Sequence, residues 1–490
     1  MKTVPKFWFE PYPWIDGDWH RDGVTTEVLN PATAEPLAAV AVVDAAVVGR
    51  AIDGAVAAQR DWARTPAAQR GRVVGEIGRL LLRQKDEFAR LLTAEQGKPY
   101  AHAVAEIDYA ASFFSWFGEE ARRVHGRIVP HPEPDREFLI RYKPCGVAGL
   151  ITPWNFPLAQ GAKKIAACLA AGCAAVWKPA EATPLVALGL APLAAEAGLP
   201  AGLLQIVPGP GPLVGGVFAE HPQVPVISLT GSTATGSTLM AAAAPGIKRL
   251  SLELGGNAPF IVLPGADLDF VAEQLVRLKL FVSGQVCVTA NRVFVDEAGH
   301  DALAERLVER FAAAKVGNGL DESVEIGPLI DGRACEKVGS LVDEAVAGGA
   351  RALCQNRGYE NDESLRAGSF FPPTVLVDVR DEMRIAREEV FGPVLGLLSY
   401  RGVGEAVRRA NETPQGLAGY VYGRDLGECR AVAESLQVGI VGINEWRPLK
   451  AEIPFGGVKQ SGIGVEGGEE GIREFLDTQV ISLPVPPLEP

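Results

Sequence analysis

A thiol and a carboxylate occupy positions from which they could act together. Cys287 follows the pair Gly284-Gln285, which breaks a helix-like run over residues 266–280, and it leads into a β-rich segment at 291–295. A cysteine at such a break can face a cleft while rigid elements hold its backbone. Glu253 ends another apolar segment and could accept a proton. A thiol nucleophile with a separate base is the simplest machinery for covalent attack on a carbonyl group.

The elements that must position these groups alternate regularly between residues 147 and 253. Strand–helix units with nearly continuous apolar strands predict a parallel, doubly wound sheet. The predicted strands lie at 147–152, 174–177, 203–207, 224–229 and 250–253, and the predicted helices at 158–171, 184–197, 212–220 and 232–243. Ligands bind such a sheet at the carboxyl ends of its strands. Polar or glycine-rich residues stand at those ends, at 153–157, 178–181, 209–212, 230–232 and 253.

Three further regions flank this unit. Residues 45–118 are helical in pattern, and a second α/β segment follows residue 267. Its predicted helices are 301–315, 334–348 and 403–411, and its predicted strands are 374–377 and 439–444. The proline-rich stretch 126–142 predicts a projecting arm for subunit contacts, with an ordinary long hairpin as the alternative. The apolar tail 480–485 would be an aggregating edge if left alone, so we expect it to pair, with a second subunit as the candidate partner.

The bulk properties exclude several classes of protein. A chain of 490 residues predicts two or three domains, and a net charge of −13 argues against nucleic acid or an anionic membrane as partner. Seven cysteines without a CxxC pair favour a reducing compartment over a disulfide scaffold. No signal peptide or membrane-spanning run is visible, which predicts a cytoplasmic protein. Six scattered histidines and no HExxH motif predict no metal site.

A phosphate-binding turn is less clearly marked. The strict GxGxxG at 462–467 lies far downstream of the strand–helix units, so we reject it as a phosphate loop. Ser232 and the amides at the predicted helix start could instead bind a pyrophosphate. A plain N-cap serine is the equally weighted alternative at that position.

Taken together, the motifs resemble the aldehyde dehydrogenase superfamily over essentially the whole chain. They lie at 153–157, 177–181, 230–232, 253–256, 284–287, 388–393 and 454–457. The segments 287–292 and 456–462 are most similar to the succinate-semialdehyde branch. The resemblance implies an NAD-binding domain (1–121 and 145–253), a catalytic domain (254–458) and an oligomerisation arm and tail (122–144 and 475–490). It also implies a homodimer or homotetramer.

The resemblance implies a role for each catalytic candidate. Cys287 would attack the aldehyde to give a thiohemiacetal and then a thioester, whose hydrolysis releases a carboxylic acid. Glu253 would take a proton from the thiol or from water, although a capping or ion-paired glutamate is the alternative. Asn155 and the Cys287 amide would bind the oxyanion. Lys164 and Glu466 match the proton-relay positions of the family, with a helix-surface lysine as the alternative for Lys164.

The resemblance further implies a nicotinamide cofactor. Lys178 and Glu181 would meet the adenosine ribose, Trp154 and Ser232 the pyrophosphate, and Glu389 the nicotinamide ribose. The full predicted set is Thr152, Trp154, Lys178, Glu181, Gly211, Ser232, Gly255, Glu389 and Phe391. A carboxylate at Glu181 accepts hydrogen bonds from a ribose diol but repels a 2′-phosphate, which predicts NAD over NADP.

The predicted substrate pocket departs from the succinate-semialdehyde branch. The two arginines that bind the substrate carboxylate there are matched by Lys163 and Phe281, and a second cysteine of that branch is matched by Thr289. The pocket mouth is predicted to hold Gln160, Lys163, Phe281, Trp446, Arg447 and Lys450. Aromatic and cationic groups suit an aldehyde with an aromatic or acidic far end, unless the cations are solvated rim charges.

Two other functions remain open at this point. A CoA-acylating enzyme would pass the acyl group to CoA and can dispense with the general base, so Glu253 favours hydrolysis. A non-catalytic binding protein on the same fold would not need Cys287, Glu253 and Asn155 together. Formation of NADH with an aldehyde separates these possibilities.

Overall fold

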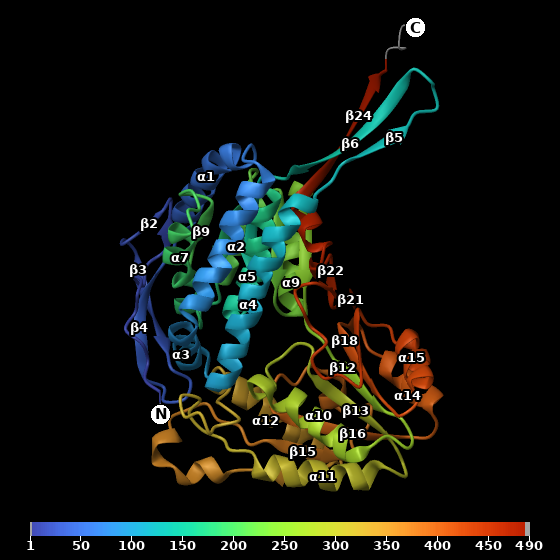
Figure 1. The fold of residues 1–490 in the computed structure, drawn as a ribbon. Helices are drawn as coiled ribbons and strands as arrows, with labels where there is room; N and C mark the ends of the chain where they lie inside the picture. The colour runs from blue at the N-terminus through green and yellow to red at the C-terminus, as the bar shows by residue number, and fades with distance from the viewer. Residues whose placement is uncertain (1, 486–490) are drawn as a thin grey trace.

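Five parallel strands form the centre of the first sheet in the computed structural model, which describes residues 2–485 (Figure 1). The sheet order is β2-β1-β9-β8-β7-β10-β11-β22. Its parallel strands are β7 (Val147–Ile151), β8 (Ala174–Lys178), β9 (Leu204–Ile206), β10 (Val226–Thr230) and β11 (Arg249–Glu253). The edges are antiparallel: β1 (Trp14–Ile15) and β2 (Asp18–Trp19) on one side, β22 (Gly462–Ile463) on the other. The predicted doubly wound sheet is confirmed.

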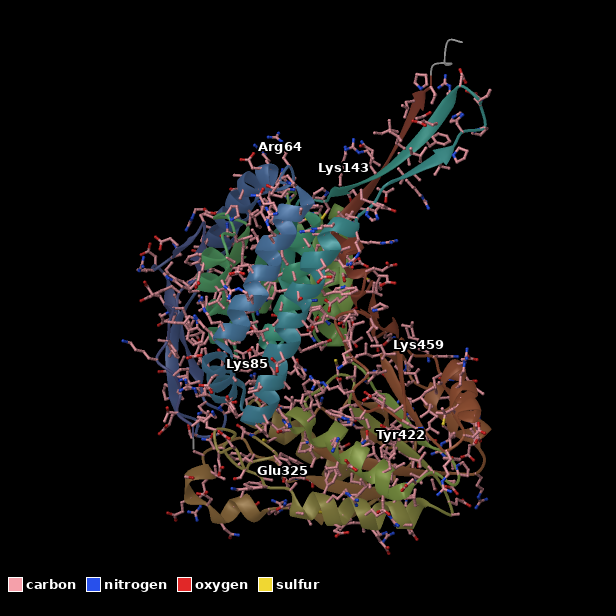
Figure 2. All side chains as sticks on the ribbon, in the orientation of Figure 1. Arg64, Lys85, Lys143, Glu325, Tyr422 and Lys459 are labelled. Carbon is pink, nitrogen blue, oxygen red and sulfur yellow. The ribbon has the colours of Figure 1, made fainter. Side chains whose placement is uncertain are left out.

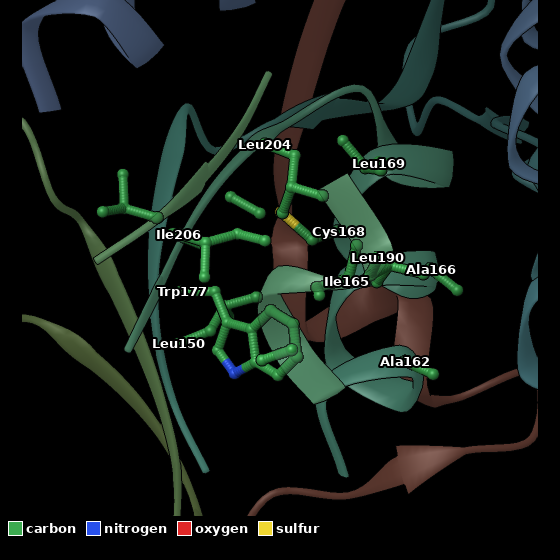
Figure 3. Close-up of a cluster of buried hydrophobic side chains, with 14 of the residues drawn as sticks. Leu150, Ala162, Ile165, Ala166, Cys168, Leu169, Trp177, Leu190, Leu204 and Ile206 are labelled. Carbon is green, nitrogen blue, oxygen red and sulfur yellow. The ribbon is translucent and has the colours of Figure 1, made fainter. Parts of the chain in front are cut away.

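Helix α5 (Pro157–Ala171) is buried along its whole length between the sheet and other helices of this half. Figure 3 shows its apolar side chains packed with Trp177 and Leu204 of the sheet. The helices α2 (Ala67–Arg83) and α4 (Tyr100–Glu120) pack against α5, and α3 (Lys85–Gln96) packs against α4. Helix α1 (Ala45–Trp62) packs against β7, β8, β9 and α8 (Gly211–Glu220), and α8 packs against α9 (Thr233–Ala243). The predicted helix 184–197 is two helices, α6 (Leu185–Leu188) and α7 (Leu190–Glu196). Pro192 lacks the N–H that would bond back to Leu188, so the helical ladder is interrupted there.

The second sheet has the order β14-β15-β16-β13-β12-β18-β19. Its strands are β12 (Ala258–Val262), β13 (Ala290–Asp296), β14 (Arg351–Gln355), β15 (Thr374–Val377), β16 (Val394–Tyr400), β18 (Ala418–Tyr422) and β19 (Ile440–Ile443). Its helices are α10 (Leu268–Leu280), α11 (His300–Ala313), α12 (Gly332–Ala347), α13 (Arg384–Arg387), α14 (Val403–Asn411) and α15 (Leu426–Ser435). The second α/β unit is therefore confirmed, with β12, β14, β16 and β18 added to the predicted strands.

An arm of three antiparallel strands projects from the first half of the molecule (Figure 1). It consists of β5 (Arg127–Pro130), β6 (Arg136–Pro144) and β24 (Leu476–Pro484). The tail strand β24 pairs with β6 of the same chain along its whole length, so the expectation that the tail pairs is confirmed, with the chain's own arm as its partner. The other edge of β24 is an edge of this sheet, and its pairing with a second subunit stays a prediction. The short helix η6 (Gly471–Phe475) directly precedes β24 at the root of the arm. Lys143 lies near this root (Figure 2). Residues 486–490 of the predicted tail lie outside the described residues.

Short strands complete the chain. The hairpin β3 (Val24–Leu29) and β4 (Pro36–Val42) lies near the N-terminus. Near the C-terminus, β17 (Gln415–Gly416) pairs with β21 (Val458–Lys459), and β20 (Pro454–Phe455) pairs with β23 (Glu466–Gly467). The C-terminal segment thus returns from the second half to the edge of the first sheet. Within residues 2–485, no helix combines the length and the apolar character needed to cross a membrane.

Candidate active site

The loop that carries Cys287 has a strained backbone. Helix α10 ends at Leu280, and the turn η3 (Phe281–Gly284) has positive φ at Val282 (50°), Ser283 (56°) and Gly284 (74°). The helix therefore ends at Leu280, as the predicted run over 266–280 does, and the left-handed turn separates it from Gln285. An added Cβ at Gly284 would collide with the backbone of Gly392. Such left-handed residues persist only where the surroundings enforce them, often at functional sites.

Cys287 lies on the walls of two cavities. The larger one, of about 790 Å³, follows the carboxyl ends of the first sheet, and the smaller one, of about 60 Å³, lies among aromatic side chains. Gln160, in the first turn of α5, also lines both. A single sulfur can therefore contact ligands that enter from either side.

Burial suppresses ionisation of this thiol. It raises the pKa of Cys287 to about 12, the charge of Glu389 adds to the effect, and the charge of Lys163 opposes it. A thiol with such a pKa is protonated at neutral pH, and only the thiolate is a strong nucleophile. Attack by Cys287 therefore requires a group that accepts its proton.

Glu253 ends β11 beside Gly462 of the edge strand and is 1% exposed. Within residues 2–485, neither of its carboxylate oxygens has a hydrogen-bond partner. Burial raises its pKa well above the usual value, and the negative charge of Glu466 acts in the same direction. Its charge in turn raises the pKa of Cys287, so this unengaged carboxylate and the thiol influence each other's ionisation. The ion-paired or capping alternative is not what the structure shows.

Two adjacent lysines of α5 converge on Glu466 of β23. The Nζ of Lys163 lies 2.6 Å from one carboxylate oxygen, and Lys164 binds the other oxygen. Lys164 also donates to the hydroxyl of Ser228, at 2.9 Å. All these side chains are buried, so Lys164 is not a surface lysine. The two positive charges hold the pKa of Glu466 below its usual value although burial alone would raise it.

Asn155 lines the large cavity together with Cys287. Its carboxamide N–H donates to the carbonyl of Gln285, two residues before the thiol, at 2.9 Å. The backbone carbonyl of Asn155 accepts from Lys98, at 2.6 Å, and Lys98 forms a buried ion pair of 2.5 Å with Glu106. Glu106 also accepts from two amides in the first turn of α5. Sequence reasoning missed this pair, although charges inside the apolar pattern of α4 were a visible signal.

Most of the predicted cofactor residues meet at the large cavity. It is lined by Thr152, Trp154, Lys178, Glu181, Gly211, Ser232 and Phe391. Gly255 and Glu389 lie together beside this wall, since the carboxylate of Glu389 accepts from the next amide, that of Gly256, at 3.2 Å. Withdrawal from water raises the pKa of Glu389 to about 7. The rings of Trp154 and Phe391 meet edge to face, with centroids 5.4 Å apart.

The wall of this cavity also carries the carboxylate of Glu181, which two hydrogen bonds hold in place. Glu181 accepts from Lys178 at 2.6 Å and from the amide of Gly211 at 2.7 Å. Partial burial opposes its ionisation, but Lys178 outweighs that effect and holds the pKa of Glu181 below its usual value. The Oγ of Ser232 accepts from the amide of Thr235 and caps α9 at the cavity wall. The N-cap reading of Ser232 is therefore correct, and its place on the wall leaves a ligand within reach.

These residues fit a dinucleotide. The cavity runs along the ends of the strands, the N-terminus of α9 opens onto it, and the ionised carboxylate of Glu181 lies on its wall. No group of three His, Cys, Asp or Glu side chains in residues 2–485 could hold a metal ion.

The small cavity is largely aromatic. It is lined by Tyr109, Phe156, Gln160, Lys163, Phe281, Cys287, Tyr420, Trp446, Arg447 and Phe455, among others. The five predicted substrate residues are all there, whereas Lys450 is exposed and lies outside the lining. The aromatic residues other than Phe281 and Trp446 were missed, because they come from α4, α5, β18 and β20, which are distant in sequence.

The two predicted cations of this cavity differ in their surroundings. The ammonium of Lys163 is turned to Glu466 and lies over the ring of Phe455, 4.0 Å from its centroid. The guanidinium of Arg447 lies 5.2 Å from the ring centroid of Phe281 and 6.0 Å from that of Trp446. Among the residues that the structure describes, none offers Arg447 a carboxylate within ion-pair distance. An anion in this cavity would therefore meet Arg447 first.

Comparison with known proteins agrees with this arrangement. Residues 19–481 match the model of the aldehyde dehydrogenase family. The chain is 43% identical to a glutarate-semialdehyde dehydrogenase of Pseudomonas putida (97% of this chain, 98% of the relative). It is 42% identical to an NADP(+) succinate-semialdehyde dehydrogenase of Escherichia coli (99% and 100%). The crystal structure of a betaine aldehyde dehydrogenase from Staphylococcus aureus in complex with NAD+ superposes with a TM-score of 0.95, at 35% identity (98% and 96%).

Proposed function

The chain belongs to the aldehyde dehydrogenase family and oxidises an aldehyde to a carboxylic acid with NAD(P), and from this premise we propose that its substrate carries an acidic or aromatic far end and that NAD is the preferred cofactor. One observation carries the assignment of the site. Cys287 lies on the wall shared by the large cavity and the small aromatic cavity. The thiol can therefore hold an aldehyde carbon between the substrate and the cofactor.

The reaction divides into two halves on Cys287. Glu253 takes the thiol proton, and the thiolate attacks the aldehyde carbon to form a thiohemiacetal. What NAD(P) supplies when bound is the acceptor for the hydride that leaves that carbon. Loss of the hydride leaves a thioester on Cys287. Glu253 then takes a proton from water, which attacks the thioester and releases the acid and the thiol.

Asn155 is the side-chain donor proposed for the oxyanion. Its carboxamide is held beside the loop of Cys287 by the bond to the Gln285 carbonyl, and Lys98 holds the backbone of Asn155 through its main-chain carbonyl. Donors that are already oriented stabilise developing charge without reorganisation, and loss of one costs about 3–4 kcal/mol of barrier.

The proton taken by Glu253 needs a route away from a buried carboxyl group. Lys164 and Glu466, with Ser228, form a buried hydrogen-bonded chain, and the charges of Lys164 and Glu466 act on Glu253. We assign them as the relay. Lys163 supports it by holding Glu466 ionised through their ion pair.

The preference for NAD rests on Glu181. Its carboxylate is held ionised at the cavity wall by Lys178 and Gly211, where it would accept from ribose hydroxyls and repel a 2′-phosphate. The relative named for NADP(+) shows that membership of the family does not fix this choice. In Glu181→Ser, the ratio of kcat/KM for NAD over NADP should fall at least tenfold. A wild-type enzyme that prefers NADP would refute the proposal.

The substrate class rests on the small cavity. Arg447 is the cation that Glu466 does not neutralise, and aromatic rings line the path from it to Cys287. The relatives named for glutarate and succinate semialdehydes oxidise aldehydes with a carboxylate end, which fits such a cation. A turnover screen over ω-oxo acids, benzaldehydes and alkanals tests the class. Highest kcat/KM on uncharged alkanals would contradict it.

A single assay tests the assignment of the nucleophile. Cys287→Ala should lose NADH formation by at least about four orders of magnitude, as expected when a covalent nucleophile is removed. Cys335→Ala is the matched control, because Cys335 is also a partly exposed thiol but lies on neither cavity. Release of free acid in the absence of CoA distinguishes hydrolysis from the CoA-acylating alternative. Undiminished activity of Cys287→Ala would refute the site.

Two further proposals concern the cellular compartment and the oligomeric state of the enzyme. The seven cysteines are all free in the structure, which supports a reducing cytoplasm. The projecting arm leaves Ile128 and Val480 exposed, at 66% and 60%, which supports a homodimer or homotetramer that covers them. Light scattering of the purified enzyme gives the number of subunits.

A further inference from the structure

A group of three cysteines lies at the root of the arm, away from the catalytic thiol. Cys145 follows β6 and precedes β7, Cys173 lies between α5 and β8, and Cys168 is in the last turn of α5. The opposite end of α5 lines the cavities of Cys287. A helix of 15 residues separates the two sites by about 22 Å. The group is therefore distinct from the active site.

Two of these thiols touch each other. The Sγ atoms of Cys145 and Cys173 are 3.6 Å apart. The Sγ of Cys173 also lies 3.2 Å from the carbonyl oxygen of Phe475, and the amide of Cys145 donates to that carbonyl. The pair thus joins three chain segments: the exit of the arm strand β6, the end of α5 and the start of β24.

The third cysteine also lies beside Cys173 but is closed to solvent. Cys168 is fully buried, and Figure 3 shows it among the apolar side chains of Leu204, Leu190 and Ile165. Cys145, by contrast, is partly exposed. The geometry favours Cys145 and Cys173 as the reactive pair.

The surroundings of Cys173 favour its thiolate. The positive charge of Arg70 acts on it from α2, and the thiols and amides next to it donate toward its sulfur. Although burial alone would raise the pKa of Cys173, these donors hold it well below its usual value. A thiolate next to a second thiol is the arrangement found in oxidisable pairs.

We propose that Cys145 and Cys173 form a modification site that a hydroperoxide oxidises to a disulfide. The Cys173 thiolate, 3.6 Å away, takes the Cys145 proton as the Cys145 sulfur attacks one peroxide oxygen. The O–O bond breaks, and the leaving hydroxide takes that proton from Cys173, which gives water and a sulfenic acid on Cys145. The Cys173 thiolate then attacks the sulfenic sulfur, the S–S bond forms, and the hydroxyl group leaves and takes up, as a second water, the proton that Cys173 lost on ionising. Two thiols and one hydrogen peroxide thus give one disulfide and two waters, and a dithiol reductant reverses the change.

This disulfide would tie the arm to the body of the molecule. It would close a loop between residues that are 28 positions apart in the sequence. Closure of a loop restricts the unfolded chain, and it fixes the exit of β6 against the end of α5. The oxidised protein should therefore melt at a higher temperature than the reduced one. The inference does not depend on the proposed function.

Peptide mapping without reductant tests the pair in Cys287→Ser, which removes the catalytic thiol. Trypsin cuts after Arg141, Lys163 and Lys164, so Cys145 is in one peptide while Cys168 and Cys173 share another. After hydrogen peroxide, we expect the two peptides joined with the loss of two hydrogen atoms and released by dithiothreitol. A disulfide confined to the second peptide, or no disulfide, would overturn the proposal.

Two variants complete the experiment. The joined peptides should disappear in Cys145→Ser but persist in Cys335→Ser, which removes a partly exposed thiol on α12. Peroxide should raise the melting temperature of Cys287→Ser and leave that of Cys287→Ser/Cys145→Ser unchanged. If the joined peptides form without a rise in melting temperature, the proposed stabilisation of the arm root is wrong.

Discussion

The reactivity of Cys287 depends on charges that come from other elements. Cys287 is half-buried, and Glu253 at the end of β11, which has no hydrogen-bond partner among the described residues, acts on the thiol through its charge. Lys163 lowers the proton affinity of both groups through its positive charge. The proton affinity of Glu253, the proposed base, therefore depends in part on Lys163, which the sequence predicted to contact substrate.

Replacement of Lys163 tests this electrostatic role. Lys163→Met removes a charge that favours ionised Glu253, so the pKa of Glu253 should rise further. The base then becomes available only at higher pH, and the acid limb of the kcat profile should move upward by about one unit, which corresponds to about 1.4 kcal/mol. Lys163→Arg keeps the charge and should restore the profile. An unmoved acid limb in Lys163→Met, together with a raised KM, would assign Lys163 to substrate binding instead.

Substitution of Arg447 tests whether its charge binds the carboxylate of the substrate. A partly buried charge pair contributes about 2 kcal/mol or more, so Arg447→Met should lower kcat/KM for ω-oxo acids about 30-fold. The effect should be in KM, and uncharged alkanals should be little affected. Lys450→Met is the matched control, because Lys450 is exposed and outside the cavity. Equal losses for charged and uncharged aldehydes would exclude a carboxylate contact.

Each key side chain is aimed by the element that carries it. The turn after α10 holds Cys287 through three consecutive left-handed residues, and α9 begins at the cavity wall with Ser232 as its cap. The sequence showed a break and a helix start at these places. It did not show the left-handed turn, because Val282 and Ser283 adopt it only under the constraint of their neighbours.

Gly284→Ala tests the turn. An Ala there requires a positive φ and collides with the backbone of Gly392, so stability should fall by about 2 kcal/mol or more. NADH formation should fall further than stability explains, because the loop of Cys287 must move. Gly404→Ala is the control, since an added Cβ on α14 meets nothing within 4 Å. Calorimetry and the aldehyde assay measure the two effects, and a fully active Gly284→Ala would contradict the role of the turn.

Ser232→Ala tests the cap of α9. Loss of an N-cap hydroxyl costs about 1 kcal/mol, and it loosens the amides that face the large cavity. The melting temperature should fall slightly, and KM for NAD should rise severalfold at unchanged KM for aldehyde. Ser237→Ala, an exposed serine inside the same helix, should leave KM unchanged. If both variants behave alike, the cap has no part in cofactor binding.

At the scale of the whole molecule, the two α/β halves share the site. The large cavity is lined mainly by the first half, yet Cys287 and Phe391 belong to the second. A cofactor in this cavity therefore contacts both halves and should stabilise them together. Ligand at about 100 times its Kd adds about 2.7 kcal/mol to the folded state.

A thermal-shift series measures this coupling. NAD should raise the melting temperature more than NADP at equal concentration, and Glu181→Ser should reduce that difference. Glu220→Ser, an exposed glutamate at the end of α8 and outside the cavity, should keep it. A larger shift with NADP in the wild type would reverse the predicted cofactor preference.

The sequence by itself determined most of the elements and the candidate catalytic groups. Apolar strands and amphipathic helices are local patterns, and Cys287 and Glu253 stand at the ends of such elements, where their residue types predict a nucleophile and a base. The role proposed for Asn155 came from the family resemblance. Family resemblance then gave the reaction, which the comparisons confirm.

Only the tertiary structure decided which groups meet. Glu466 forms ion pairs with both lysines of α5. Strand β24 pairs with β6 of its own chain, and Cys145 lies against Cys173. The aromatic wall of the small cavity likewise gathers residues from α4, α5, β18 and β20. These contacts join distant parts of the chain, and no local pattern encodes a distance across the fold. Burial and charge pairing, which set the proton affinities of the site, arise from that same long-range packing.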